Sequence, residues 1–172
     1  MKFKLLIPVL FLFISSTLFA QQPTSEILNE AYKQATLENK NVLVIFQASW
    51  CSWCKKMDQN INNEKIKESL EANYVIVHLS VLESKKNTHL ENPGAEDLLK
   101  EHNAVKAGLP YWLIFDKDKN LIGNSLGSDN QNMGCPSTKQ EIIDLKSTLK
   151  KTSKLTEEEL NLIGEVFYIE KK

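Results

Sequence analysis

The sequence predicts a single α/β domain in which helices flank a central mixed sheet. The chain has 172 residues, which is enough for one domain with an extensive core. Apolar runs of strand length alternate with segments whose apolar residues recur at helical spacing. Strand–helix units come first, followed by an antiparallel hairpin and further helices, and this order is typical of an α/β fold.

The amino-terminal segment 1–20 has the pattern of a secretory signal peptide, so the domain is expected to span 21–172. Lys2 and Lys4 precede an apolar stretch, and Ala20 ends the segment at the expected cleavage point. An uncleaved anchor is the alternative, but the stretch is shorter than the roughly 20 residues that span a bilayer. We therefore expect a periplasmic or secreted protein.

Composition limits the classes of partner. The net charge is −1 and every basic residue is lysine, so the chain lacks the one-sided basic field of nucleic-acid-binding proteins. We expect a monomer that binds no nucleic acid. Three cysteines is an odd number, which leaves one thiol over if two of them pair. The expected compartment permits disulfides and contains enzymes that exchange them.

The first half of the chain carries helix and strand signals in turn. Thr24 is a candidate cap for a helix over 24–39, which has apolar residues on one face. The unbroken apolar run 42–46 predicts a strand buried on both faces. After the cysteine motif and its helix, Asn63 is a candidate cap for a short helix, and 74–81 predicts a second strand.

The second half begins with a polar loop over 83–94 and a short helix over 96–102. Strands are predicted over 111–115 and 120–126, and the segment 116–119 between them has the chemistry of a hairpin turn.

An irregular loop over 127–136 precedes the last two predicted helices. Ser137 with Gln140 predicts a capping box for the first of these helices, and Thr156 with Glu159 predicts one for the second.

The segment 50–57, Trp-Cys-Ser-Trp-Cys-Lys-Lys-Met, carries the expected chemistry. It directly follows the buried strand, so Cys51 is expected at a helix amino terminus, where free N–H groups favour a thiolate. Cys54 lies one turn further on and is expected to be more buried and to stay protonated longer. This asymmetry predicts that Cys51 is the nucleophile and Cys54 the resolving cysteine. Lys55 and Lys56 add positive charge nearby.

These residues resemble the thioredoxin-like superfamily, in particular the branch with the motif W-C-x-W-C-K-K-[ML]. The chain is similar there to the carboxy-terminal domain of the disulfide-reducing membrane protein DsbD, from the helix before Asn41 to about Gly127. The resemblance implies a thioredoxin-like fold, to which the helix after Thr156 is an addition. It also implies that Pro110 follows a cis peptide bond and faces the cysteines, and that the Leu109 backbone pairs with an extended substrate chain.

The sequence also departs from that family. Typical thioredoxins carry a buried aspartate where this chain has Ile45, so the usual proton acceptor for Cys54 is absent. Asp58 is a weak substitute, and a specialised partner is expected rather than a broad range of substrates. The loops over 83–94 and 127–136 are longer than in a minimal thioredoxin.

Other interpretations of the motif remain open. The Cys51–Cys54 pair is also compatible with a purely structural disulfide, although so short a loop stabilises a fold little. Two thiolates with Cys135 and a histidine are compatible with a zinc or copper site, but no second metal-ligand motif accompanies them. We therefore predict no metal and no cofactor other than the redox-active disulfide.

Several other side chains have two interpretations. Trp50 and Trp53 are either packing residues or, as we favour, an apolar collar that binds substrate around the sulfurs. Cys135 is either an unpaired bystander, which we favour, or a third redox thiol. His78 is expected to be an ordinary strand residue, and none of the three histidines is assigned a function.

The favoured function is that of an exported thiol–disulfide oxidoreductase that reduces or isomerises disulfides of exported proteins and is recharged by a membrane electron donor. The alternative is a non-catalytic thioredoxin-like adaptor or a copper chaperone that uses the same surface. The intact cysteine pair favours the enzyme. The direction of electron flow depends on the relative stability of dithiol and disulfide, which the sequence does not give.

Overall fold

The strand β1 (Asn41–Gln47) lies between two layers of helices, and five of its seven side chains are buried. The computed structural model describes residues 21–169, and the expected signal peptide lies outside them. The sheet has four strands in the order β2-β1-β3-β4. The other strands are β2 (Tyr74–Ser80), β3 (Tyr111–Phe115) and β4 (Leu121–Asn124). The strand predicted over 42–46, buried on both faces, is confirmed.

The sheet is mixed, as predicted. β1 pairs with β2 in parallel, which places Ile45 beside His78, and with β3 in antiparallel, which places Ile45 beside Trp112. β3 and β4 form the predicted antiparallel hairpin, with an irregular register between Ile114 and Phe115. Because parallel neighbours need a crossover connection, the chain between β1 and β2 forms helices that cover one face.

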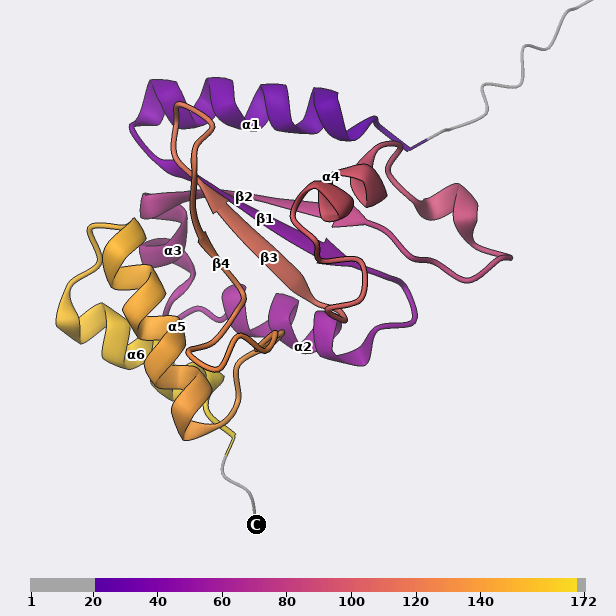
Figure 1. The fold of residues 1–172 in the computed structure, drawn as a ribbon. Helices are drawn as coiled ribbons and strands as arrows, with labels where there is room; N and C mark the ends of the chain where they lie inside the picture. Colours follow the sequence, from indigo (N-terminus) through magenta and orange to yellow (C-terminus); the bar gives the residue numbers. More distant parts are fainter. Residues whose placement is uncertain (1–20, 170–172) are drawn as a thin grey trace, which may run out of the picture.

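Two helical layers enclose the sheet (Figure 1). One layer holds α1 (Thr24–Glu38) and α4 (Ala95–Glu101). The other holds α2 (Ser52–Ile61), α3 (Lys67–Asn73), α5 (Lys139–Thr152) and α6 (Glu157–Phe167). A short 3-10 helix, η1 (Thr88–Leu90), lies in the predicted loop after β2. Side chains of β1 alternate between the two cores, so that Val44 packs with α1 and Ile45 with α2 and α6.

Helix caps show where prediction succeeds and where it fails by a residue or more. The capping box of α6, from Thr156 and Glu159, is confirmed. The box of α5 is formed by Thr138 and Glu141, so the prediction of Ser137 with Gln140 was wrong. The cap therefore lies one residue later than predicted, where the Thr138 side chain accepts from the Glu141 N–H. The Ser137 N–H also donates to the Glu141 carboxylate.

Two further predicted caps were wrong. Pro23 occupies the cap position of α1, and the Thr24 N–H donates to the Pro93 carbonyl instead. The Asn63 side chain accepts from the Lys65 N–H in a local turn, and α3 begins only at Lys67. The Thr24 N–H therefore bonds to a carbonyl distant in sequence, whereas the Asn63 side chain forms a local turn.

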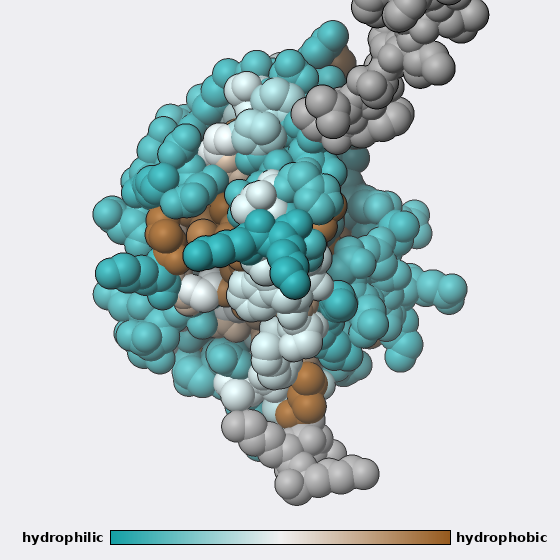
Figure 2. Space-filling view, turned by 90° about the vertical axis from the view of Figure 1, so that its right-hand side faces the viewer, coloured by the Kyte–Doolittle hydropathy of each residue, from teal (hydrophilic) through white to brown (hydrophobic). Residues whose placement is uncertain are grey.

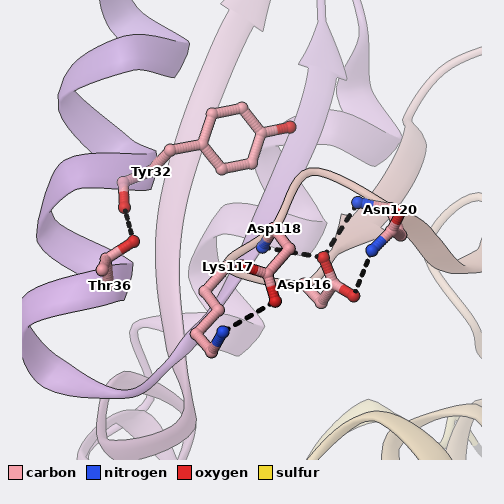
Figure 3. A network of polar contacts seen from close by, with 6 residues as sticks. All are labelled: Tyr32, Thr36, Asp116, Lys117, Asp118 and Asn120. Carbon is pink, nitrogen blue, oxygen red and sulfur yellow. Dashed lines mark hydrogen bonds and ion pairs between the residues drawn. The ribbon is translucent and has the colours of Figure 1, made fainter.

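The turn between β3 and β4 has the predicted chemistry (Figure 3). The Asp116 carboxylate accepts from the backbone N–H groups of Asp118 and Asn120 and from the Asn120 amide. These bonds hold the pKa of Asp116 below its ordinary value. The Lys119 ammonium lies 5.3 Å from the centre of the Tyr32 ring, which connects the turn to α1.

We predict that the additional helix α6 is part of the cooperative core. Leu160 is 1% exposed, whereas Ile143 on α5 is 59% exposed. Leu160→Ala should lower the free energy of unfolding by about 3 kcal/mol, because it removes buried apolar contacts and leaves a cavity. Ile143→Ala, the matched control, should change it by less than about 0.5 kcal/mol. Denaturant titration measures both, and equal values for the two variants would contradict the prediction.

Candidate active site

Cys51 and Cys54 form a disulfide at the start of α2, with their Cα atoms 5.2 Å apart. The chain leaves the sheet after Gln47 and turns through a short loop in which the Cys51 N–H donates to the Ala48 carbonyl. β1 and β2 both point toward this end of the molecule (Figure 1). The predicted position of the motif, at a junction from a buried strand to a helix, is confirmed.

The Cys51 sulfur lies at the amino terminus of α2, where the N–H groups of the first turn create a positive potential. Cys51 is the cap residue of the helix, and its Sγ accepts a hydrogen bond of 3.0 Å from the Cys54 N–H. Free N–H groups at a helix amino terminus stabilise a thiolate and lower its pKa. The helix therefore favours charge on Cys51 when the pair is reduced.

The two cysteines are equally buried, at 3% and 4% exposure, so the expectation that Cys54 is more buried was wrong. Both sulfurs pack beneath Ala48 and the half-buried Leu109. What distinguishes them is their surroundings. Cys51 caps the helix, whereas Cys54 lines a polar cavity on the side of β2.

The two tryptophans of the motif lie on the surface. Trp50 is 59% exposed and Trp53 is 49% exposed. The Trp50 indole N–H donates to the Leu82 carbonyl at 2.9 Å, which fixes the orientation of the ring. The face of the molecule on the side of α4 is mainly hydrophilic, with pale and apolar patches between hydrophilic areas (Figure 2).

The Leu109–Pro110 peptide bond is cis, as expected, and leads directly into β3. Pro110 is buried, and Leu109 contacts the cysteine cluster. The structure therefore brings this segment to the cysteines.

Asn132 holds the segment before β3 in place, which the sequence did not indicate. Its side-chain amide lies within 3.1 Å of the carbonyl oxygens of Ala107, Gly108 and Pro110 and donates to them. Its carbonyl oxygen accepts from the Gly134 N–H. An asparagine in an irregular polar loop gives no signal of such a role, because its partners are backbone groups distant in sequence.

Glu83 supports the opposite side of the site and was also missed. Its carboxylate accepts from the backbone N–H and from the hydroxyl of Ser49, two residues before Cys51. The Glu83 N–H in turn donates to the Glu91 carboxylate. The longer loop after β2 thus holds the loop that leads into the cysteine motif.

Cys135 is a free, buried cysteine in the loop after β4. It lines a cavity of about 250 Å³ together with Trp53 and Pro110, so its loop reaches the active-site end. Burial raises the pKa of the Cys135 thiol to about 11, although Lys56 lowers it and Glu141 adds to the rise. A protonated, buried thiol is a poor nucleophile.

A larger open cavity of about 670 Å³ lies beside Cys54 and is lined by Lys55, Asp58 and His78 among others. Asp58 is therefore close to Cys54, as the sequence indicated, but about half of its side chain faces solvent. Ile45 is fully buried in the apolar core. His78, to which no function was assigned, faces this cavity.

Among residues 21–169, no three His, Cys, Asp or Glu side chains gather as metal ligands. No helix in the same range is long and apolar enough to cross a membrane.

The chain matches the sequence model of one known protein family. The model of the Thioredoxin-like family matches residues 23–117, which is more than half of the chain. No curated protein sequence matches significantly.

Solved structures give further likenesses at low sequence identity. A disulphide isomerase from Xylella fastidiosa Temecula1 is 15% identical with a TM-score of 0.51, over 83% of this chain and 87% of that one. The DsbH oxidoreductase is 20% identical with a TM-score of 0.48, over 71% and 81% of the two chains. The oxidised DsbD carboxy-terminal domain of Neisseria meningitidis is 23% identical with a TM-score of 0.41, over 61% and 84%.

We predict that Cys135 of the native, oxidised protein reacts slowly with iodoacetamide. A rise of its pKa from 9.0 to about 11 reduces the thiolate fraction at pH 8 by about 100-fold. The rate should increase about tenfold per pH unit until the pH approaches that pKa. The same residue in guanidinium-unfolded protein is the control, and mass spectrometry follows both. Equal rates in the two states would contradict the prediction.

Proposed function

Because the chain belongs to the thioredoxin-like family, we propose that it is an exported thiol–disulfide oxidoreductase that reduces or isomerises disulfides of exported proteins. The observation that carries the proposal is the Cys51–Cys54 pair at the start of α2, packed beneath Leu109. A helix amino terminus lowers the pKa of the first cysteine, and a second cysteine one turn away can complete the exchange.

The reaction starts from the dithiol form. The Cys51 thiolate attacks one sulfur of the substrate disulfide, whose S–S bond breaks, and the first substrate thiolate leaves and takes up a proton. Cys54 then loses its proton and attacks the Cys51 sulfur, which releases the second substrate thiolate. The substrate gains two electrons and two protons, and the protein ends as the Cys51–Cys54 disulfide.

The surface around the cysteines suits an extended polypeptide. The exposed rings of Trp50 and Trp53 offer apolar contact area beside the sulfurs. The Leu109 backbone makes no hydrogen bond with the described residues. The carbonyls on either side of it, those of Gly108 and Pro110, accept hydrogen bonds from the Asn132 amide. A substrate segment can therefore pair with Leu109 as an added strand.

Recharging requires a dithiol donor, which we propose is located at the membrane. Periplasmic or secreted localisation follows from the pattern of segment 1–20. The reduction potential of the Cys51–Cys54 couple decides whether the protein reduces, oxidises or reshuffles its substrates.

We predict that the protein reduces the interchain disulfides of insulin in the presence of dithiothreitol. Cys51→Ser should remove this activity, because no nucleophile remains at the start of α2. Cys54→Ser should instead accumulate mixed disulfides through Cys51, which non-reducing gels and mass spectrometry detect. Cys135→Ser is the control and should retain wild-type activity.

Wild-type activity in Cys51→Ser would contradict the catalytic assignment. Trapping by Cys51→Ser but not by Cys54→Ser would reverse the two roles. An inactive wild-type protein would favour the adaptor interpretation.

We further predict that Trp53 contributes to the binding of protein substrates. Trp53→Ala should raise the KM for insulin about fivefold to tenfold, which corresponds to about 1.0–1.4 kcal/mol of lost binding. Turnover of glutathione disulfide, which is too small to need the ring, should change less than about twofold. Leu37→Ala removes an exposed apolar side chain from α1 in the other layer and is the matched control. An unchanged KM in Trp53→Ala would contradict the role.

A further inference from the structure

Cys54 has to lose a proton before it can attack the mixed disulfide, and β1 offers no group that accepts it. The buried residue of β1 in the same layer as α2 is Ile45, which packs against Met57 and Trp112 in the apolar core. The strand contains no ionisable residue. The acceptor therefore has to lie on another side of Cys54.

The cavity beside Cys54 contains such a group. Its walls include Lys55 and Asp58 from α2 and His78 from β2. His78 is the neighbour of Ile45 in the parallel register, so its side chain projects into the same layer as α2. The cavity is open, has a volume of about 670 Å³, and has both polar and apolar side chains in its walls.

The position of the imidazole suits proton transfer. Its Nε2 atom is buried and has no hydrogen-bond partner among residues 21–169. The nearest charge is the Asp58 carboxylate, whose Oδ1 lies 3.7 Å from Nε2, beyond hydrogen-bond length. The nitrogen is thus free to accept a proton, and an anionic group is close enough to stabilise the imidazolium that forms.

We propose that His78 accepts the Cys54 proton across the cavity that both residues line, with Asp58 as the residue that stabilises the protonated ring. This inference rests on the proposed function and assigns a further residue to its second step. The proton passes from the Cys54 sulfur to Nε2, and the Cys54 electron pair forms the bond to the Cys51 sulfur. The bond between Cys51 and the substrate breaks, and the substrate thiolate leaves with the electron pair and takes the proton from His78 or solvent.

The charges around His78 agree with this role. Burial lowers the pKa of His78, and the Asp58 carboxylate opposes that effect. The ring is therefore neutral at pH 7 and able to accept. The other charged groups that line the cavity are Lys55 from α2 and Glu83 from the loop after β2, and β1 contributes only uncharged side chains.

The test measures the two steps separately. Reduced protein is mixed with excess glutathione disulfide, quenched with acid at intervals and separated by mass into reduced, mixed-disulfide and oxidised species. His78→Gln should leave formation of the mixed disulfide on Cys51 unchanged and slow its resolution by at least about tenfold at pH 6.5. The difference should shrink as the pH rises, because Cys54 then ionises without an acceptor.

Two variants complete the design. Asp58→Asn should slow resolution less than His78→Gln does, and the pKa of His78, followed by NMR, should fall further because the stabilising carboxylate is gone. His102→Gln makes the same chemical change at a ring that contacts Phe115 in the other layer, and should behave as wild type.

The outcomes are distinct. Wild-type resolution in His78→Gln at pH 6.5, with normal formation of the mixed disulfide, overturns this inference and leaves the proposed function intact. If the wild-type protein forms neither the mixed disulfide nor the oxidised Cys51–Cys54 species, the proposed function is overturned and this inference with it. Slow resolution in His102→Gln as well overturns the specific role of His78.

Discussion

The burial of β1 on both faces is the constraint on which the active site depends. A shift of one residue in the register of a strand moves each side chain to the opposite face of the sheet. Because the side chains on both faces of β1 pack into a core, such a shift would disrupt both cores. The register of β1 is therefore fixed, and the chain leaves the sheet at Gln47. With only the residues from Ala48 to Trp50 before the motif, Cys51 has to lie where α2 begins. The thiolate-stabilising position thus follows from packing of the strand and needs no charged residue near the sulfurs.

The same constraint determines where proton chemistry can take place. A charged acceptor in the centre of β1 would have to be desolvated between two apolar layers, which is costly without a paired charge. Ile45 fills that position with apolar contacts instead. β2 borders only one strand, β1, and its residues His78 and Ser80 near the active-site end are half-buried. A histidine on β2 can therefore face both the sheet and a solvent-accessible cavity, where ionisation costs less.

The fold and the cysteine pair could be predicted from the sequence because their signals are local. Strand runs, the junction from strand to helix and the hairpin turn each lie within a few consecutive residues, whereas the cis bond before Pro110 was expected from the family resemblance. Asn132 and His78 could not be found in this way, because their partners are distant in sequence and are brought near by β3 and by the parallel register of β1 and β2. The misplaced caps have another cause. At Ser137 the neighbouring polar residue Thr138 caps the helix instead, and at Thr24 the preceding Pro23 takes the cap position.

The two long loops hold the site from opposite sides, through Glu83 at the segment before Cys51 and through Asn132 at the segment before β3. Each loop supplies a polar side chain that binds backbone groups, so the loops fix the path of the chain on both sides of the sulfurs. The Trp50 ring is held through the Leu82 carbonyl by the first of these loops. A partner that binds this surface therefore meets groups that are already ordered, which lowers the conformational entropy lost on association. Such preorganisation favours partners of matching shape over flexible chains.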